Sequence, residues 1–307
     1  MNEDAIRRIG DRLGPGAIEA IVGLPGSDVT TLMLEIARRR AEDADAADVL
    51  RRYETDRFVR PGSIGIDVIH RVEAELFASL PEGFEPVVPS PVVPLGTHRL
   101  GGVDQSRVVS TVRSNEVAAD PTNGLTLEAA VRRRELLRID PRSSHGVKLA
   151  ASQRVVRAQR FEADGAFSHF QLFGLVSAGR DTGDLGFERE AVVEHIRFAV
   201  DVISRLTGSD AVVELTDLTG ADMADVADGV RDALPGVTVD DRPDREAGRA
   251  YYDRMCFKAY ASGDERFEIA DGGLVDWTQR LVQSRKERLM ISGLGVERLA
   301  MVLAGSV

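Results

Sequence analysis

Two extended runs joined by a polar loop, within residues 155–181, constrain the fold of this chain more than any other feature of its sequence. The first run, residues 155–161, roughly alternates apolar and polar residues, and the second run, residues 170–176, is mostly apolar. The connection between them contains Asp164-Gly165, a pair typical of turns between strands. The pattern predicts a β-hairpin, so the chain is expected to fold around an antiparallel sheet.

The side chains of this hairpin suit a nucleotide. Arg157 and Gln159 are two residues apart, so on a strand they point to the same face, and His169, Phe170 and Phe173 open the second run. Arginine offers a planar fork to phosphate oxygens, glutamine can read an adenine edge, and an aromatic ring can stack on the base. A surface hairpin with a solvated arginine and core phenylalanines explains the same residues equally well.

A second segment, residues 289–303, has the pattern of an apolar strand, a Gly-x-Gly turn and the start of a helix. Gly293 and Gly295 allow the backbone to turn tightly, and Arg298 on the first helical turn is expected to point back toward the end of the sheet. On its own, this pattern also fits an ordinary strand-to-helix turn.

Together the two segments resemble motifs 2 and 3 of the class II aminoacyl-tRNA synthetases. In that family a strand arginine contacts the α-phosphate of ATP, an aromatic residue of the returning strand stacks on adenine, and a Gly-x-Gly-x-Glu-Arg element supplies an arginine at the γ-phosphate. By this resemblance Arg157 and Arg298 are catalytic and bind ATP. Gln159 replaces the usual glutamate, and the stacking ring is Phe170 in one registration and Phe173 in another, with His169 beside the first. The resemblance implies an α+β fold in which helices flank an antiparallel β-sheet.

The first 60 residues are expected to form a small helical region of their own, ending where Arg60-Pro61-Gly62 breaks the helical pattern. Residues 61–307 would then form the synthetase-like core, with no anticodon-binding domain. Within the core, residues 64–80 have helical apolar spacing and lead into a proline-rich extended segment, residues 84–94. This order resembles motif 1, which forms the dimer interface of these synthetases, and so implies a homodimer.

Two adjacent tyrosines and a later glycine pair resemble the histidyl branch of the family. This branch includes histidyl-tRNA synthetase and its catalytically silent relative, the regulatory subunit of ATP phosphoribosyltransferase. In both, a Tyr-Tyr strand and a Gly-Gly-x-x-Asp turn line the amino-acid pocket. The matching residues here are Tyr251, Tyr252, Gly272, Gly273 and Asp276. The arginine that precedes the tyrosine pair in the synthetase falls on Ala247, which is a departure from the pattern.

The histidyl branch also uses a glutamate, within an Arg-Pro-Glu-x-Thr segment, to hold the α-amino group of the substrate. Aligned on the proline, this position falls on Thr122 in the present chain. Glu128, further along, is the acidic candidate for the same role. A surface glutamate at the start of a helix explains Glu128 equally well.

The composition excludes several classes of function. Fifty acidic residues against 39 basic ones give a net charge of -11, which argues against a broad nucleic-acid-binding surface. A local basic site is compatible with this charge, but bulk binding of tRNA or DNA is not indicated. A single cysteine excludes an internal disulfide, and the five histidines show no metal-ligand spacing. Neither a signal peptide nor an apolar run of membrane-spanning length is present, so a cytoplasmic protein without a membrane partner is expected.

The resemblance implies an ATP-dependent, adenylate-forming ligase that activates an amino acid or a related carboxylate, with Mg²⁺ bridging the phosphates. The acceptor need not be a tRNA, so a protein acceptor or a partner enzyme is expected. The acidic residues downstream of the hairpin, among which the sequence does not choose a metal ligand, are Asp181, Asp184, Glu188 and Glu190. The alternative is a catalytically silent, ligand-sensing regulatory subunit. The two arginines favour the enzyme, whereas Gln159, Thr122 and the missing pocket arginine favour the regulator.

Overall fold

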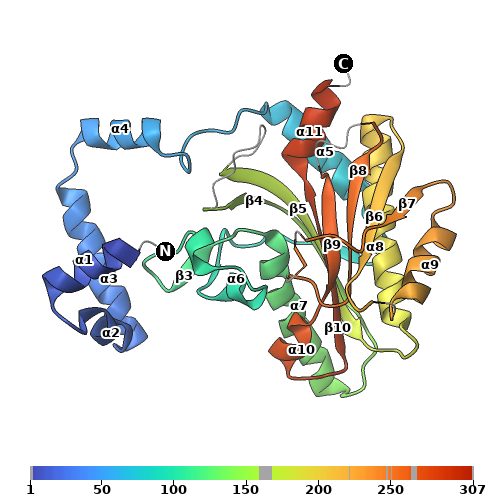
Figure 1. The fold of residues 1–307 in the computed structure, drawn as a ribbon, viewed down its shortest axis with the longest axis horizontal. Coiled ribbons are helices and arrows are strands. Elements are labelled where there is room, and N and C mark those ends of the chain that lie inside the picture. The colour runs from blue at the N-terminus through green and yellow to red at the C-terminus, as the bar shows by residue number, and fades with distance from the viewer. Residues whose placement is uncertain are drawn as a thin grey trace.

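A computed structural model describes residues 3–158, 168–220, 222–246, 248–249, 251–263 and 268–305 (Figure 1). Its centre is an eight-stranded sheet of order β1-β4-β5-β10-β9-β8-β6-β7. The inner pairs are antiparallel, and the outer pairs β1–β4 and β6–β7 are parallel. The strands are β1 (Phe84–Pro86), β4 (Val147–Val156), β5 (His169–Arg180), β6 (Ala211–Asp217), β7 (Thr238–Asp241), β8 (Met255–Ala261), β9 (Ala270–Val275) and β10 (Glu287–Gly295). The expected α+β architecture is confirmed.

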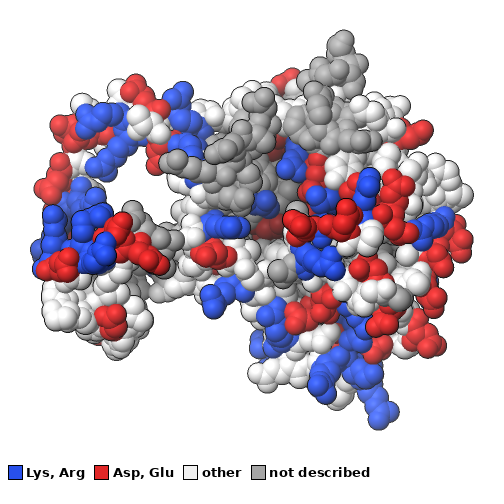
Figure 2. Space-filling model, viewed as in Figure 1, with Lys and Arg blue, Asp and Glu red and all other residues white. Residues whose placement is uncertain are grey.

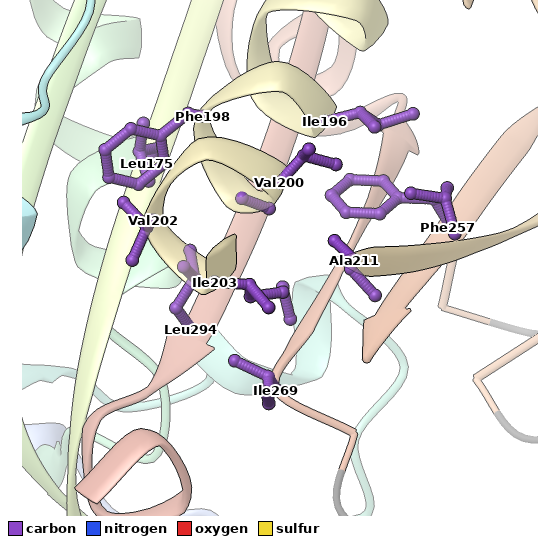
Figure 3. Close-up of a cluster of buried hydrophobic side chains, with 14 of the residues drawn as sticks. Leu175, Ile196, Phe198, Val200, Val202, Ile203, Ala211, Phe257, Ile269 and Leu294 are labelled. Atoms are coloured by element: carbon purple, nitrogen blue, oxygen red, sulfur yellow. The ribbon is translucent and has the colours of Figure 1, made fainter. Parts of the chain in front are cut away.

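Helices cover both faces of this sheet. One face carries α5 (Ile66–Ala78), α8 (Gly186–Thr207), α9 (Ala224–Ala233) and α11 (Val296–Gly305), and the other carries α7 (Pro121–Ile139) and α10 (Trp277–Val282). Beside α7 lie the short helices α6 (Thr97–Leu100) and η1 (Gln105–Arg107) and the two-stranded sheet of β2 (Val92–Pro94) and β3 (Asn115–Val117). Figure 3 shows the larger core, in which apolar side chains of α8 such as Ile196, Phe198 and Ile203 meet strand residues such as Leu175 and Leu294.

Helix α7 is fixed to the sheet by a fully buried ion pair. Arg133 Nε lies 2.7 Å from Glu287 Oε2, and Arg133 Nη2 lies 2.9 Å from Glu287 Oε1, so the contact is bidentate. The same guanidinium also donates to the carbonyls of Ser143 and His145. Because removing one partner of such a pair leaves a buried charge that costs about 3–5 kcal/mol, the pair holds α7 in one position over β10.

The opposite face contains a buried neutral histidine. His195 of α8 lies 2.9 Å from Ser177 Oγ through Nε2 and 2.8 Å from Ser292 Oγ through Nδ1. Burial lowers the pKa of His195 to about 3, so the ring is uncharged at neutral pH and joins α8 to β5 and β10.

Several expected elements form with different boundaries. The hairpin is present, but β4 ends at Val156, so Arg157 lies just beyond the strand. Gln159 is among residues 159–167, outside the described part of the chain. The proline-rich segment 84–94 forms two separate strands rather than one, because prolines lack the N–H needed to continue a ladder: β1 joins the main sheet and β2 pairs with β3.

The sequence-based predictions of two glycine-containing turns were wrong. Gly293 and Gly295 lie in β10, which leads directly into α11, and Gly272 and Gly273 lie in β9. None of these four glycines has a positive φ. Conversely, the tyrosine pair expected on a strand lies in a turn before β8.

The N-terminal helices α1 (Glu3–Leu13), α2 (Ala17–Val22), α3 (Gly26–Glu42) and α4 (Ala46–Thr55) lie to one side of the sheet (Figure 1). None of their described residues is buried. The helical character of this region agrees with the sequence, and its independence as a domain stays a prediction. Among the residues that the structure describes, no helix is long and apolar enough to cross a membrane.

We expect His195 to make folding sensitive to acid. The unfolded chain binds a proton at the ordinary pKa of histidine and the folded chain does not, so stability falls as the pH falls below about 6.5. Between pH 6.5 and 4.5 this single group costs about 2 to 3 kcal/mol. His195→Gln removes this contribution, so the difference in unfolding free energy between the native chain and the variant should shrink by that amount over this range, measured by chemical denaturation. His145→Gln, at an exposed position outside α5, should leave the pH dependence unchanged. Parallel curves for the native chain and His195→Gln would contradict the assignment.

Candidate functional site

One cavity on the α7 face of the sheet gathers several of the predicted site residues. Its volume is about 820 Å³, and its floor is formed by β5, β9 and β10. The predicted residues that line it are Thr122, Arg157, Phe170, Tyr251, Tyr252 and Arg298. The fold therefore brings together arginines from segments far apart in the sequence.

Glycines allow other segments to lie directly on the floor of this cavity. A Cβ on Gly174 of β5 would lie 2.8 Å from Pro121 Cγ at the start of α7. A Cβ on Gly273 of β9 would lie 2.5 Å from Tyr252 Cδ1. Because real side chains do not tolerate such contacts, glycine at these two positions is what lets α7 and the tyrosine turn approach the sheet.

Arg157 lies at one end of the cavity, held by the segment before α7. Its Nε donates to the carbonyl of Ala119 at 3.0 Å, and its Nη2 lies 3.4 Å from Asp120 Oδ2. Its Cζ lies 5.0 Å from the ring centroid of Phe170, which is a cation–π distance. About one third of the Arg157 side chain is exposed, so its charge remains available to a ligand.

The alternation of β5 separates the three aromatic candidates. Phe170 faces the cavity, whereas His169 and Phe173 point to the opposite face of the sheet. Phe173 is fully buried against Phe77 and Phe198, with ring centroids 5.0 and 5.8 Å away. His169 accepts from Arg154 Nε at 3.0 Å and contacts the carbonyl of Arg60. Phe173 and His169 are therefore not available to a base in this cavity, and Phe170 is.

Arg298 lines the same cavity from the first turn of α11. Its Nη1 donates to the carbonyl of Glu268 and lies 3.7 Å from Glu268 Oε1, and about half of its side chain is exposed. The neighbouring Glu297 is buried, and its Oε2 accepts from the backbone N–H of Gln171 at 2.6 Å. Burial raises the pKa of Glu297, and this hydrogen bond fixes the start of α11 against β5.

A partly buried carboxylate that the sequence motifs do not include also lines the cavity. Asp271 of β9 accepts from Arg245 Nη2 at 2.9 and 3.0 Å and from the Tyr252 hydroxyl at 2.8 Å. Burial, followed by the neighbouring Glu268 carboxylate, raises the pKa of Asp271 to about 6. The sequence could have identified Asp271, because it is two residues before Gly273 and so lies on the same face of the strand.

The acidic residue of this segment that lines the cavity is Asp120 rather than Glu128. Asp120 is the N-cap of α7, and its Oδ1 accepts from Thr122 N at 2.9 Å and from Thr122 Oγ1 at 2.7 Å. Glu128 lies two turns into α7, on its outer surface, where it pairs with Arg132 at 2.8 Å, and it does not line the cavity. The Asp-Pro pair is an ordinary start signal for a helix and could have identified Asp120.

Three other expected pocket residues, Gly272, Gly273 and Asp276, do not line the cavity, and Tyr252 covers Gly273. Asp276 pairs with Arg280 at 2.9 Å at the start of α10, and its side chain is about half exposed. A Cβ on Gly272 would meet Phe257 and Ser292, so this position faces α8 rather than the cavity. Ala247, where the synthetase has an arginine, lies outside the described residues.

The acidic residues downstream of the hairpin lie beyond the far end of β5, away from Arg157. Asp181 pairs with Lys286 and Arg288, and Glu188 is buried against arginines. In the described parts of the chain, no group of three or more His, Cys, Asp or Glu side chains is arranged to hold a metal ion. A metal in the cavity would therefore need ligands from a bound molecule.

The structure is similar to solved structures of the histidyl branch. It superposes on an ATP phosphoribosyltransferase regulatory subunit/histidyl-tRNA synthetase from Bacillus halodurans with a TM-score of 0.62, at 11% identity, covering 80% of this chain and 82% of that one. A histidine–tRNA ligase subunit from Alicyclobacillus acidocaldarius gives 0.59 at 13% identity, covering 80% and 97%. The apo histidyl-tRNA synthetase of S. aureus gives 0.56 at 14% identity, covering 78% and 65%.

The chain has the class II synthetase-like fold. The similar structures belong to the branch that the tyrosine and glycine segments resemble, so that resemblance is confirmed for the fold. By sequence, no protein-family model and no curated protein matches the chain. At these identities the similarity extends to the fold, and activity has to be argued from the cavity itself.

We expect Gly273→Ala to destabilise the chain by about 1–3 kcal/mol, because the added Cβ would meet Tyr252 and the carbonyl of Met255. Gly293→Ala is the matched control in the neighbouring strand, because its nearest contact would be Leu172 at an ordinary 3.6 Å. The test is chemical denaturation of both variants. Equal stabilities would show that the tyrosine turn does not lie on β9.

Proposed function

We propose that this chain binds ATP and an amino acid or a related carboxylate in the cavity and joins them as an adenylate. The observation that carries the proposal is that Arg157, with Phe170 beside it, and Arg298 line the same cavity from segments far apart in the chain. A volume of about 820 Å³ lies within the usual range for small-molecule sites.

Each residue has a role in this proposal that follows from its chemistry. The Phe170 ring stacks on the adenine, Arg157 neutralises the α-phosphate and Arg298 neutralises the γ-phosphate. Asp120 accepts the substrate's ammonium group, and Asp271 with Tyr252 forms the polar wall beside it. A carboxylate oxygen of the substrate forms a bond to the α-phosphorus, the bond from that phosphorus to the β-bridging oxygen breaks, and pyrophosphate leaves.

Mg²⁺ fits this cavity as a companion of the triphosphate. Because Mg²⁺ keeps several waters and commonly uses one or two carboxylates plus substrate phosphates, a complete protein cage is not required. Glu268, next to Arg298, is the carboxylate best placed to share it. Bound there, Mg²⁺ would neutralise charge on the leaving pyrophosphate.

A regulatory, ligand-sensing role is the second candidate, and the charge of the cavity favours it. The carboxylates that line the cavity outnumber the arginines six to four: Asp104, Asp120, Glu246, Glu268, Asp271 and Glu297 against Arg107, Arg157, Arg249 and Arg298. Arg157 and Arg298 both already have acidic partners. Such a site suits a ligand with donor groups at least as well as a triphosphate.

We also propose a homodimer, with α5 and the strand after it at the interface. Ile66 and Phe77 on α5 are exposed, at 66% and 37%, although other residues of the helix form part of the core. Transfer to a protein or small acceptor, or action through a partner enzyme, is proposed in preference to tRNA charging. Figure 2 supports this preference, because acidic and basic side chains are interspersed over the face that it shows.

The decisive experiment for the adenylate is pyrophosphate exchange into ATP, measured with each standard amino acid in the absence of tRNA. We expect at least one substrate to support exchange and Arg298→Ala to abolish it. Arg157→Ala should weaken ATP binding about 10- to 100-fold by calorimetry, as expected for losing one charge-assisted contact.

A control variant and a substrate-binding variant complete this experiment. Arg205→Ala, an exposed arginine on α8 outside this cavity, should change neither binding nor exchange. Asp120→Asn should weaken the binding of any substrate that has a free α-amino group. If no substrate supports exchange while an amino acid still binds, the enzyme proposal fails and the regulatory one stands.

The dimer has its own test. Light scattering at micromolar concentration should give twice the chain mass, and Ile66→Asp should reduce it toward the monomer because a charge would be buried at the interface. A monomeric native chain would rule out the interface.

A further inference from the structure

A second cavity lies at the other end of β10 from Arg298 and shares no lining residue with the first. Its volume is about 300 Å³, and its polar lining consists of Glu188, Asp253, Arg254, Gln279, Arg285 and Arg288. All of these residues are described by the structure. This cavity is too small for ATP and has the size of an amino-acid site.

Glu188 has an unsatisfied oxygen in the wall of this cavity. The residue is 1% exposed, and its Oε1 accepts from Arg254 Nη1 at 2.6 Å and from Arg288 Nε at 2.8 Å. Its Oε2 is buried and has no hydrogen-bond partner. A buried carboxylate oxygen without a donor is costly, so a ligand that supplies an N–H to Oε2 would bind favourably.

The remaining charges of the cavity favour an anion. Three arginines line it, Arg254, Arg285 and Arg288. Arg254 and Arg288 already pair with Glu188, and Arg288 also pairs with Asp181, so Arg285 is the arginine left for a ligand. Arg285 is exposed to solvent, and a guanidinium group binds a carboxylate through two parallel hydrogen bonds.

We propose that this second cavity binds a free α-amino acid, with the ammonium group on Glu188 Oε2 and the carboxylate on Arg285. An inorganic anion would pair with Arg285 and leave Glu188 Oε2 without a donor, and a simple cation would do the reverse. A zwitterion of amino-acid size satisfies both. The site does not depend on the function of the first cavity.

The test is calorimetric titration of the whole chain with each standard L-amino acid. We expect at least one to bind, and its affinity to fall at least tenfold in Arg285→Ala and in Glu188→Gln. Asp120→Asn, which alters only the first cavity, should leave this binding within twofold. Arg180→Ala, on β5 and outside both cavities, is the matched control and should also have no effect.

The carboxylic acid that lacks the ammonium group of the best-binding amino acid provides a second measurement. It should bind at least tenfold more weakly, because it leaves Glu188 Oε2 without a donor. If Glu188→Gln does not fold, which thermal unfolding will show, Arg285→Ala and this analogue carry the test.

Three results would overturn the proposal. These are the absence of binding by any amino acid at millimolar concentration, binding that Arg285→Ala leaves unchanged, and equal affinity for the amino acid and its carboxylic acid analogue. If Asp120→Asn abolishes the binding of the amino acid and Arg285→Ala does not, the ligand belongs to the first cavity instead.

Discussion

The close approach of α7 and the tyrosine turn to the sheet is the constraint on which the larger cavity depends. It exists because Gly174 and Gly273 carry no Cβ at points where one would clash with Pro121 and Tyr252. With α7 in this position, its N-cap residue Asp120 comes next to Arg157. The buried pair between α7 and β10 then keeps the helix in place, so backbone proximity and one ion pair together position Asp120 at the cavity.

Charges in the larger cavity occur as pairs. Arg157 lies beside Asp120, Arg298 beside Glu268, and Arg245 with Asp271. Pairing keeps the cost of partly buried charges low in the free protein. It also means that a ligand must replace an existing contact both at Arg157 and at Arg298. A ligand that carries both signs of charge therefore fits the cavity better than one that carries only negative charge.

The two cavities are separate, yet the same two elements contribute to both. The turn before β8 gives Tyr251 and Tyr252 to the larger cavity and Arg254 to the smaller one. Strand β9 gives Asp271 to the larger and Leu274 to the smaller. A displacement of either element would therefore alter both cavities, which is the geometry needed for coupling between sites.

The sequence by itself predicted the fold class and selected Arg157 and Arg298, which both line the cavity. It could do so because hairpin and strand-to-helix patterns are local and do not depend on how the elements pack. It could not choose among the rings of β5, since helices cover both faces of the sheet and an almost continuous apolar run hides which face each residue takes. Only the tertiary structure placed Phe173 in the core and Phe170 at the cavity. It likewise showed that Asp120, and not Glu128, lines the cavity. The direction in which a helix presents its carboxylates depends on how that helix packs, and α7 packs on β5, a segment distant in the chain.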